Sequence, residues 1–308
     1  MALNLIFMGT PDFAVPILKS IHKSKHKILE VYTQPPKKKG RGQKINLSPV
    51  HKFSNEVKLS VRHPEVLDQQ EIKNIDKQNP DIVVVVAYGK ILPKRLLQLK
   101  NIKFINIHAS LLPKWRGAAP IQRSIMNLDK ETGISIMKIE PKLDSGPIMM
   151  RSKIDIKENT SYIDLSSQLS LLGADMILKS LSLLEKNEET FIPQIENEAT
   201  YAKKISKKET KIYWNQKAKH IIAKINALNI NPGSWFELKG FRIKPISVKE
   251  IEASGEPGEI IDDNLTVACL ENAVRILELQ REGKQKMKAE EFLRGSRIKV
   301  GTNISSDV

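Results

Sequence analysis

Residues 81–89, DIVVVVAYG, constrain the fold more than any other segment of this 308-residue chain. A near-continuous run of β-branched residues is typical of a strand that is buried on both faces of a parallel sheet. Parallel neighbours need long crossover connections, usually helices, so this segment predicts an α/β fold. Further strands are predicted at residues 3–9, 26–34, 103–110, 133–139 and 148–156.

Helical patterns lie between and after these strands. Residues 10–24 predict a loop and a helix, with apolar residues at Phe13, Ile17 and Ile21. Residues 160–187 predict a long amphipathic helix capped by Thr160 or Ser161. Strands that alternate with helices predict a doubly wound, Rossmann-like, mainly parallel sheet, whose ligands bind beyond the carboxyl ends of the strands.

The pattern of predicted secondary structure changes after about residue 205. A helix is predicted at 217–228, followed by short strands separated by Gly, Pro and Asn, at 233–238, 241–251, 258–262, 265–270 and 273–280. This pattern predicts a small C-terminal antiparallel β-barrel. A chain of this length suggests two domains, and we place them at residues 1–204 and 205–308.

Composition favours a cytoplasmic protein without a membrane segment. No run reaches the roughly 18 apolar residues that a membrane span needs. The amino terminus, MALNLIFMG, has no basic region before its apolar stretch and is interpreted as a strand, not a secretory signal. The single cysteine, Cys269, excludes an intramolecular disulfide and fits a reducing compartment. Its apolar surroundings, LTVACL, indicate a core residue.

The charge of the chain is strongly positive and unevenly distributed. The net charge is +15, and residues 1–63 carry twelve Lys and Arg against three acidic residues. A second basic stretch, YAKKISKKETK, spans residues 201–211. An isolated lysine run is usually a solvated face, but two such runs together favour a nucleic-acid partner.

Several familiar site motifs are absent from the sequence. The turn after the first strand, GTPDFAVP, has one glycine and two prolines where a dinucleotide-binding turn has G-x-G-x-x-G. There is no P-loop, no G-x-S-x-G elbow and no Cys or His set with metal-ligand spacing. We therefore expect no metal.

Asn106, His108 and Asp144 are the candidate catalytic residues. Asn106 and His108 lie two residues apart on a predicted strand, so they project from the same face near its carboxyl end. Asp144 lies in the turn PKLDSGP and supplies a carboxylate that could orient an imidazole. A lone strand histidine is more often structural, but the Asn partner and the turn-rich segment that follows favour a catalytic site.

The sequence resembles methionyl-tRNA formyltransferases. The central motif NIHASLLP at 106–113 and WRGAAPIQR at 115–123 is similar to the signature of that family. So are FMGTPDFAVP, TQP, VVAYGKILP, LDSGPI and EFLRGSRI, which together span residues 5 to about 300. The chain departs from the family at the start of the basic loop, where it has Pro36-Lys37-Lys38-Lys39.

The resemblance implies transfer of a formyl group from 10-formyltetrahydrofolate to the amino group of methionine on initiator tRNA. Asn106 would stabilise the oxyanion, and His108 would add a second donor or relay a proton. Asp144 would fix the imidazole tautomer and help to deprotonate the amine. Part of the folate site would be formed by Ser110, Leu111, Leu112 and Pro113.

The basic loop would bind the tRNA, with the barrel as a second basic surface resembling oligonucleotide-binding (OB) barrels. The phosphate-binding residues would be Lys37, Lys38, Lys39, Arg41 and Lys44. We expect this loop to be disordered alone and ordered on binding. We also expect the protein to be a monomer.

Three alternatives remain open. A folate-dependent formyltransferase that acts on a small amine, such as a glycinamide nucleotide or an amino sugar, would keep Asn106, His108 and Asp144 but leave the basic loop unexplained. A folate-dependent hydrolase that releases formate would use a similar site. A non-catalytic RNA-binding module would explain the charge but not the three grouped polar residues.

Overall fold

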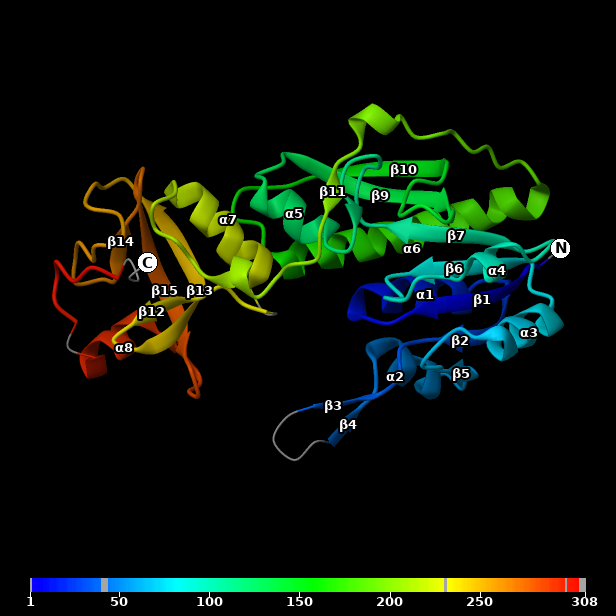
Figure 1. The fold of residues 1–308 in the computed structure, drawn as a ribbon, viewed down its shortest axis with the longest axis horizontal. Helices are drawn as coiled ribbons and strands as arrows, with labels where there is room; N and C mark the ends of the chain where they lie inside the picture. The colour runs from blue at the N-terminus through cyan, green and yellow to red at the C-terminus, as the bar shows by residue number, and fades with distance from the viewer. Residues whose placement is uncertain (1, 40–43, 230–231, 297, 305–308) are drawn as a thin grey trace. The chain divides into compact units, whose positions relative to one another are not determined.

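A seven-stranded sheet with the order β10-β9-β7-β6-β1-β2-β5 forms the first half of the fold (Figure 1). The computed structural model describes residues 2–39, 44–229, 232–296 and 298–304. Strands β5, β2, β1, β6 and β7 are parallel, and β9 runs antiparallel to β7. The predicted mainly parallel, Rossmann-like sheet is therefore confirmed. Its strands are β1 Asn4–Gly9, β2 Lys27–Tyr32, β5 Val61–Arg62, β6 Ile82–Val86, β7 Lys103–His108, β9 Glu131–Lys138 and β10 Ile148–Asp155.

The helices predicted within residues 10–24, at 160–187 and at 217–228 are present as α1, α6 and α7, whereas the other described helices were not predicted. The described helices are α1 Val15–His22, α2 Pro49–Glu56, α3 Gln69–Gln78, α4 Lys94–Leu97, α5 Pro120–Met126, α6 Tyr162–Lys186, α7 Ala218–Leu228 and α8 Ala289–Ser296. Of the two caps considered for α6, Ser161 is the one that accepts the backbone N–H of Asp164 at 3.2 Å. Thr160 instead donates to the carbonyl of Lys157.

The two faces of the sheet are covered by different helices. On one face, Gly173 of α6 lies close enough to Ile17 of α1 and Ile107 of β7 that even a Cβ would touch both. On the other face, Phe104 of β7 joins a buried cluster that includes residues of α3 and α4. Because side chains alternate along a strand, Asn106 and His108 share the face of Phe104. The site is therefore built on one face, at the carboxyl end of β7.

The basic loop is described only at its flanks, because its centre, residues 40–43, lies outside the described residues, and the expected disorder therefore stays a prediction. Its flanks form two short antiparallel strands, β3 Lys37–Lys39 and β4 Lys44–Asn46. The predicted contact Arg41 lies outside the described residues. The sequence predicted only a turn-rich loop here, because strands of three residues are too short to show an alternating pattern.

The chain forms two compact units. The first comprises residues 1–117, 131–154 and 166–202, and the second comprises residues 118–130, 155–165 and 203–308. Two short segments that precede residue 166 thus belong with the C-terminal unit, which a single boundary does not anticipate. The boundary between residues 204 and 205 stays a prediction.

The second unit contains a five-stranded antiparallel sheet with the order β12-β13-β15-β14, and β16 pairs with β15. Its strands are β12 Phe236–Leu238, β13 Phe241–Ile251, β14 Thr266–Ala268, β15 Ala273–Arg281 and β16 Lys286–Lys288. Helix α7 and the side chains of Trp214 and Phe236 belong to its core, with these two rings edge to face at 5.4 Å. The antiparallel C-terminal domain is confirmed. Pairings among the described residues do not close the sheet, so the OB-like barrel stays a prediction.

Cys269 is buried in this core, as its apolar neighbours predict. Burial raises the pKa of its thiol to about 12. The thiolate is therefore scarce at neutral pH, which disfavours a nucleophilic role. Within the described residues, no helix combines the length and the apolar character that crossing a membrane requires.

Glu209, the one acidic residue of the basic stretch 201–211, forms an ion pair with Arg123. Its Oε2 accepts Arg123 Nη1 at 2.7 Å, and its Oε1 accepts the backbone N–H of Ser206 at 2.9 Å. Arg123 also donates to the carbonyl of Lys203 at 2.9 and 3.2 Å. Chiefly because of the hydrogen bond from Arg123, the pKa of Glu209 falls from 4.5 to about 2. These contacts tie α5 to residues 203–209 within the second unit.

We expect Glu209→Gln to destabilise the second unit at pH 7 by about 1 kcal/mol, a value set by the 36% exposure of the carboxylate. A depressed folded-state pKa stabilises the fold above the unfolded value and loses that effect as pH falls through the folded value. The difference between wild type and variant should therefore shrink between pH 4.5 and about 2. Urea unfolding over this pH range measures it. Glu237→Gln, an exposed glutamate with no ion pair to a described residue, is the control and should show no such trend.

Candidate active site

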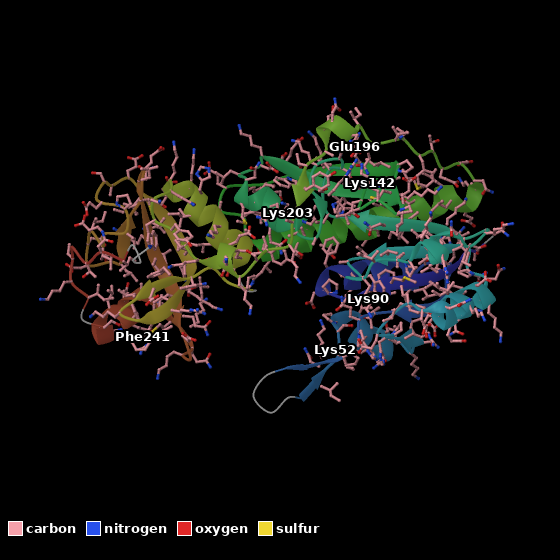
Figure 2. The ribbon with its side chains drawn as sticks, in the orientation of Figure 1. Lys52, Lys90, Lys142, Glu196, Lys203 and Phe241 are labelled. Atoms are coloured by element: carbon pink, nitrogen blue, oxygen red, sulfur yellow. The ribbon has the colours of Figure 1, made fainter. Side chains whose placement is uncertain are left out.

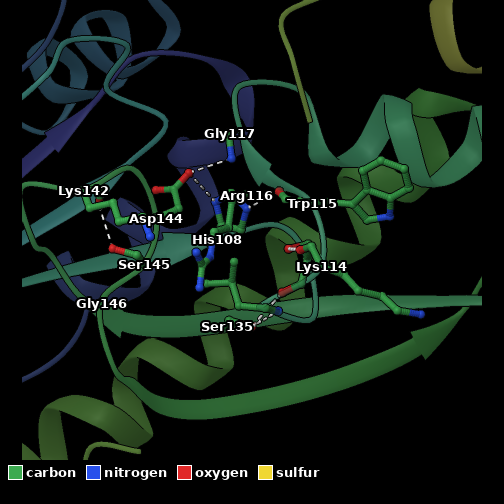
Figure 3. A network of polar contacts seen from close by, with 12 residues as sticks. His108, Lys114, Trp115, Arg116, Gly117, Ser135, Lys142, Asp144, Ser145 and Gly146 are labelled. Atoms are coloured by element: carbon green, nitrogen blue, oxygen red, sulfur yellow. Dashed lines mark hydrogen bonds and ion pairs between the residues drawn. The ribbon is translucent and has the colours of Figure 1, made fainter. Parts of the chain in front are cut away.

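His108 lies at the carboxyl end of β7 and is buried, with 6% of its surface exposed. Its Nε2 is 2.8 Å from the carbonyl oxygen of Trp115 (Figure 3). A carbonyl only accepts hydrogen bonds, so Nε2 carries a proton, and in the neutral ring Nδ1 is the nitrogen with a free lone pair. The tautomer is therefore fixed by the Trp115 carbonyl, whereas we had expected Asp144 to fix it.

Asp144 faces the other nitrogen of the ring. Its Oδ2 is 3.7 Å from His108 Nδ1 and accepts the backbone N–H of Gly117 at 2.8 Å. Among the described residues none hydrogen-bonds to Oδ1, which leaves that oxygen for a substrate. The residue has a positive φ of 45°, a conformation that Asp tolerates better than most residues. The turn that carries Asp144 thus brings its carboxylate to the imidazole, as predicted.

Asn106 occupies the strand position two residues before His108. Its side chain is partly exposed, and no residue that the structure describes hydrogen-bonds to its carboxamide. Since neighbouring positions of the same parity share a face, the amide projects from the surface that carries His108. A carboxamide with no internal partner can donate to a ligand without breaking a protein contact. The structure therefore places Asn106 and His108 on one face of β7 and brings the Asp144 carboxylate beside His108.

Gly117 reaches Asp144 because a short parallel ladder fixes its backbone. Strand β8, Arg116–Gly117, pairs with β11, Tyr201–Ala202. Gly117 has a φ of +122°, and a Cβ at this position would come within 2.8 Å of the Ala202 carbonyl oxygen. Only glycine combines that backbone angle with so close an approach. This explains why the donor to Asp144 is a glycine N–H.

Arg116, the other residue of β8, is buried, with 1% of its surface exposed. Its Nε donates to Gln194 Oε1 at 3.0 Å and its Nη1 to Glu196 Oε2 at 2.9 Å. Glu196 also pairs with Lys142, and hydrogen bonds from Lys142 and then Arg116 lower the pKa of the Glu196 carboxyl. Figure 2 places Lys142 and Glu196 near each other on the first unit. The positive charge of the buried Arg116 guanidinium is thus paired with the Glu196 carboxylate through Nη1.

The segment predicted to form part of the folate site is mostly internal. Ser110, Leu112 and Pro113 are buried, and Leu111 is partly exposed. The Ser110 hydroxyl donates to the carbonyl of Lys114, and Ser135 Oγ bridges the carbonyl of Ser110 and the N–H of Leu112 (Figure 3). These bonds shape the turn after His108. Of the four side chains, Leu111 is therefore the one presented for contact with a ligand.

Sequence reasoning missed the groups that position the site. Two of them are backbone atoms, the Trp115 carbonyl and the Gly117 N–H, which leave no side-chain signal. Gln194 and Glu196 lie in the irregular segment FIPQIENEAT, which has no periodicity. Of the side chains that position the site, Arg116 is the one that lies in a motif singled out in the sequence, WRGAAPIQR at 115–123.

Comparison with known protein families and curated relatives points to the same kind of site. Residues 3–181 match the family described as formyl transferase, and residues 204–297 match the formyl transferase C-terminal domain. Over 309 aligned residues, the chain is 46% identical to the methionyl-tRNA formyltransferase of Pelagibacter ubique, and 99% of this chain and 100% of that one are covered. The chain belongs to the methionyl-tRNA formyltransferase family. It is accordingly a formyl-transferring enzyme, and the predicted resemblance is confirmed.

Solved structures support the same fold at lower identity. HypX from Aquifex aeolicus in complex with tetrahydrofolic acid superposes with a TM-score of 0.68 at 15% identity. The match covers 95% of this chain and 47% of HypX, so the chain spans about half the length of that protein. An N-formyltransferase from Helicobacter canadensis, in complex with folinic acid and dTDP-3-aminofucose, has a TM-score of 0.67 at 17% identity, and the match covers 90% of this chain and 99% of that one. At such identity the likeness shows the fold alone.

Proposed function

We propose that this family member transfers the formyl group of 10-formyltetrahydrofolate to the α-amino group of methionine on initiator tRNA. The amine nitrogen bonds to the formyl carbon, the bond from that carbon to N10 of the folate breaks, and N10 takes up a proton as the amine loses one. The observation that carries the proposal is the grouping of Asn106, His108 and Asp144 at the carboxyl end of β7. No metal is needed, because the donor is already an activated formyl group.

Asn106 stabilises the charge that develops on the formyl oxygen. Its carboxamide is partly exposed and lacks a partner among the described residues, so its N–H groups are available. A donor already aimed at the position of a developing oxyanion is usually the largest single catalytic contribution. The strand backbone holds Asn106, which keeps the cost of reorganisation low.

His108 and Asp144 handle the proton of the amine. Asp144 Oδ1, which no described residue hydrogen-bonds, accepts from the incoming amine, and His108 Nδ1 takes the proton. The resulting imidazolium donates from both nitrogens, to the Trp115 carbonyl and toward Asp144 Oδ2. Because Nε2 is already committed to Trp115, we favour the proton relay over a second oxyanion donor.

The folate binds along the turn after His108. It supplies the formyl group on N10, and Leu111 is the partly exposed member of the segment 110–113 that can contact it. Ser110, Leu112 and Pro113 act from beneath by shaping the turn. The contact of this segment with the donor remains part of the proposal.

The basic hairpin β3–β4 binds the tRNA phosphates. It carries the predicted contacts Lys37, Lys38, Lys39, Arg41 and Lys44. Lysine contacts with phosphate set affinity and salt dependence without reading sequence. The described flanks of this segment pair as two short antiparallel strands, whose backbone provides a scaffold for the segment.

We expect the substitution of Lys37, Lys38 and Lys39 by alanine to raise the KM for tRNA and leave kcat unchanged. Each lost phosphate contact lowers the slope of log affinity against log salt by about 0.7 to 0.9, so the slope should fall by about 2 to 3. Steady-state kinetics between low and moderate salt measure this. A matched triple variant of the exposed Lys23, Lys73 and Lys77 should keep the wild-type slope. Equal slopes in the wild type and both triple variants would show that Lys37, Lys38 and Lys39 form a solvated face that does not contact tRNA.

The C-terminal unit carries an aromatic and cationic cluster that supports a second RNA contact. Lys211 lies 5.8 Å from the ring centres of both Tyr213 and Trp235, and Arg242 Cζ lies 4.4 Å from that of Trp235. Lys224 lies 5.8 Å from the Tyr213 ring, which is half exposed. Cations and exposed rings are the groups with which proteins contact RNA phosphates and unstacked bases.

The direct test is transfer of labelled formyl from 10-formyltetrahydrofolate to methionyl initiator tRNA, with free methionine and glycinamide ribonucleotide as competing acceptors. Labelling of the tRNA alone, lost in His108→Ala, is the expected result. Labelling of a small amine instead would keep the catalytic residues and overturn the tRNA assignment. Release of formate without transfer would indicate a hydrolase, and binding of tRNA without any folate-dependent activity would indicate an RNA-binding module. Cytoplasmic location, which a single buried cysteine fits, and a monomeric state complete the proposal.

A further inference from the structure

Gln194 makes three hydrogen bonds with one carboxamide. Its Nε2 donates to the carbonyl oxygens of Asp144 at 2.9 Å and Gly146 at 2.8 Å. Its Oε1 accepts Arg116 Nε at 3.0 Å. The chemistry of the partners fixes the orientation of the amide, because the reverse would place two donors against each other and an oxygen against two carbonyls. The three bonds use both amide protons and the oxygen of this side chain.

These bonds close a ring of contacts around Asp144. Gln194 holds the Asp144 backbone and also holds Arg116, whose neighbour Gly117 donates to the Asp144 carboxylate. The carboxylate that faces His108 is therefore fixed from two sides, at its main chain and at its side chain. The turn needs such support, because Asp144 has a positive φ and the preceding Leu143 is 58% exposed.

The second anchor of the ring is a buried charge. The Arg116 guanidinium keeps Nη2 buried without a hydrogen-bond partner among the described residues. Its remaining bonds therefore matter more, since a buried donor left without a partner is destabilising. An acceptor on Nε stabilises the guanidinium, and Gln194 supplies it from the segment that also carries Glu196.

We propose that Gln194 is a positioning residue for formyl transfer, which holds Asp144 Oδ2 against Gly117 N–H and opposite His108 Nδ1. It acts through Asp144 and does not itself contact substrate. The proposal rests on the roles of Asp144 and His108 in the proposed function. A displacement of a catalytic group by about 1 Å can cost about 100-fold in rate, so the loss of this support should be visible in kcat.

The test compares Gln194→Leu, Asp144→Asn and the double variant. We expect Gln194→Leu to lower kcat by about 10- to 100-fold, with the KM values for both substrates within about twofold of wild type. If Gln194 acts through Asp144, the double variant should match Asp144→Asn alone. Multiplication of the two effects, or a wild-type kcat in Gln194→Leu, would overturn the proposal.

Two further variants separate positioning from general damage to the fold. Gln194→Glu keeps an acceptor for Arg116 but loses both donors to the turn, so it should lose kcat as Gln194→Leu does. Recovery of wild-type kcat in Gln194→Glu would contradict the proposal. Gln280→Leu removes a carboxamide that donates to the Lys284 carbonyl in the C-terminal sheet and should leave kcat unchanged.

Hydrogen exchange provides a readout that does not depend on the acceptor. The Gly117 N–H is bonded to Asp144 Oδ2, so its protection should fall in Gln194→Leu and persist in Gln280→Leu. Unchanged protection of Gly117 in Gln194→Leu would overturn the proposal. If wild type transfers formyl to another amine, the proposed tRNA substrate fails, while the Gly117 measurement still decides the role of Gln194.

Discussion

Asn106→Ala should lower kcat for formyl transfer by about 10²- to 10³-fold, the usual cost of removing one oxyanion donor. The carboxamide lacks a partner among the described residues, so its removal breaks no protein hydrogen bond and should leave the fold intact. The KM for tRNA and for the folate should change little, because the interaction strengthens only as charge develops on the formyl oxygen. Single-turnover formylation with saturating substrates measures the chemical step.

Two controls define this prediction. Asn106→Asp keeps the shape of the side chain but replaces the donor by a carboxylate, so its loss should be at least as large. Asn74→Ala, on α3, removes a carboxamide whose oxygen accepts from Gln70 and should retain full activity. A kcat within about threefold of wild type in Asn106→Ala would assign Asn106 to packing and leave the oxyanion without this donor.

Asp144→Asn should lower kcat by about 10²- to 10⁴-fold, the range that general acid–base groups contribute. The oxygen of the new amide can still accept the Gly117 N–H, so the turn should persist. With the amide oxygen at the Oδ2 position, the NH₂ group takes the place of Oδ1 and presents donors where the carboxylate would accept from the incoming amine. The imidazolium that forms on His108 would also lose the negative charge beside Nδ1.

The measurement is kcat at several pH values, together with thermal unfolding to show that the variant is folded. Asp175→Asn, an exposed aspartate on α6, removes the same charge elsewhere and should behave as wild type. An Asp144→Asn enzyme with near wild-type kcat at every pH would show that the amine loses its proton without this carboxylate.

The elements that the sequence predicts well are those whose pattern is repeated over many residues. The run of β-branched residues at 82–86 became the buried central strand β6, with all five of its residues buried. The long amphipathic pattern became α6, Tyr162–Lys186. Such a pattern is the sum of many residues along one element, so contacts with the rest of the fold rarely change the secondary structure that it predicts.

Short elements and unit membership were not predictable in the same way. The hairpin β3–β4 has three residues per strand, too few for a periodic signal. Residues 118–130 and 155–165 belong with the C-terminal unit, although segments of the first unit precede and follow each of them in the sequence. Which unit a segment joins depends on contacts far apart in sequence, and no local pattern records them.

The sequence by itself determined the family, the α/β class and the grouping of Asn106 with His108, because i and i+2 on a strand always share a face. Only the tertiary structure decided how the site is held. The Trp115 carbonyl fixes the His108 tautomer and the Gly117 N–H holds Asp144, and backbone groups of this kind are identical in every residue. Gln194, which joins Arg116 to the Asp144 turn, lies 50 residues from that turn. Its role follows from where the chain returns in space, which spacing in the sequence does not encode.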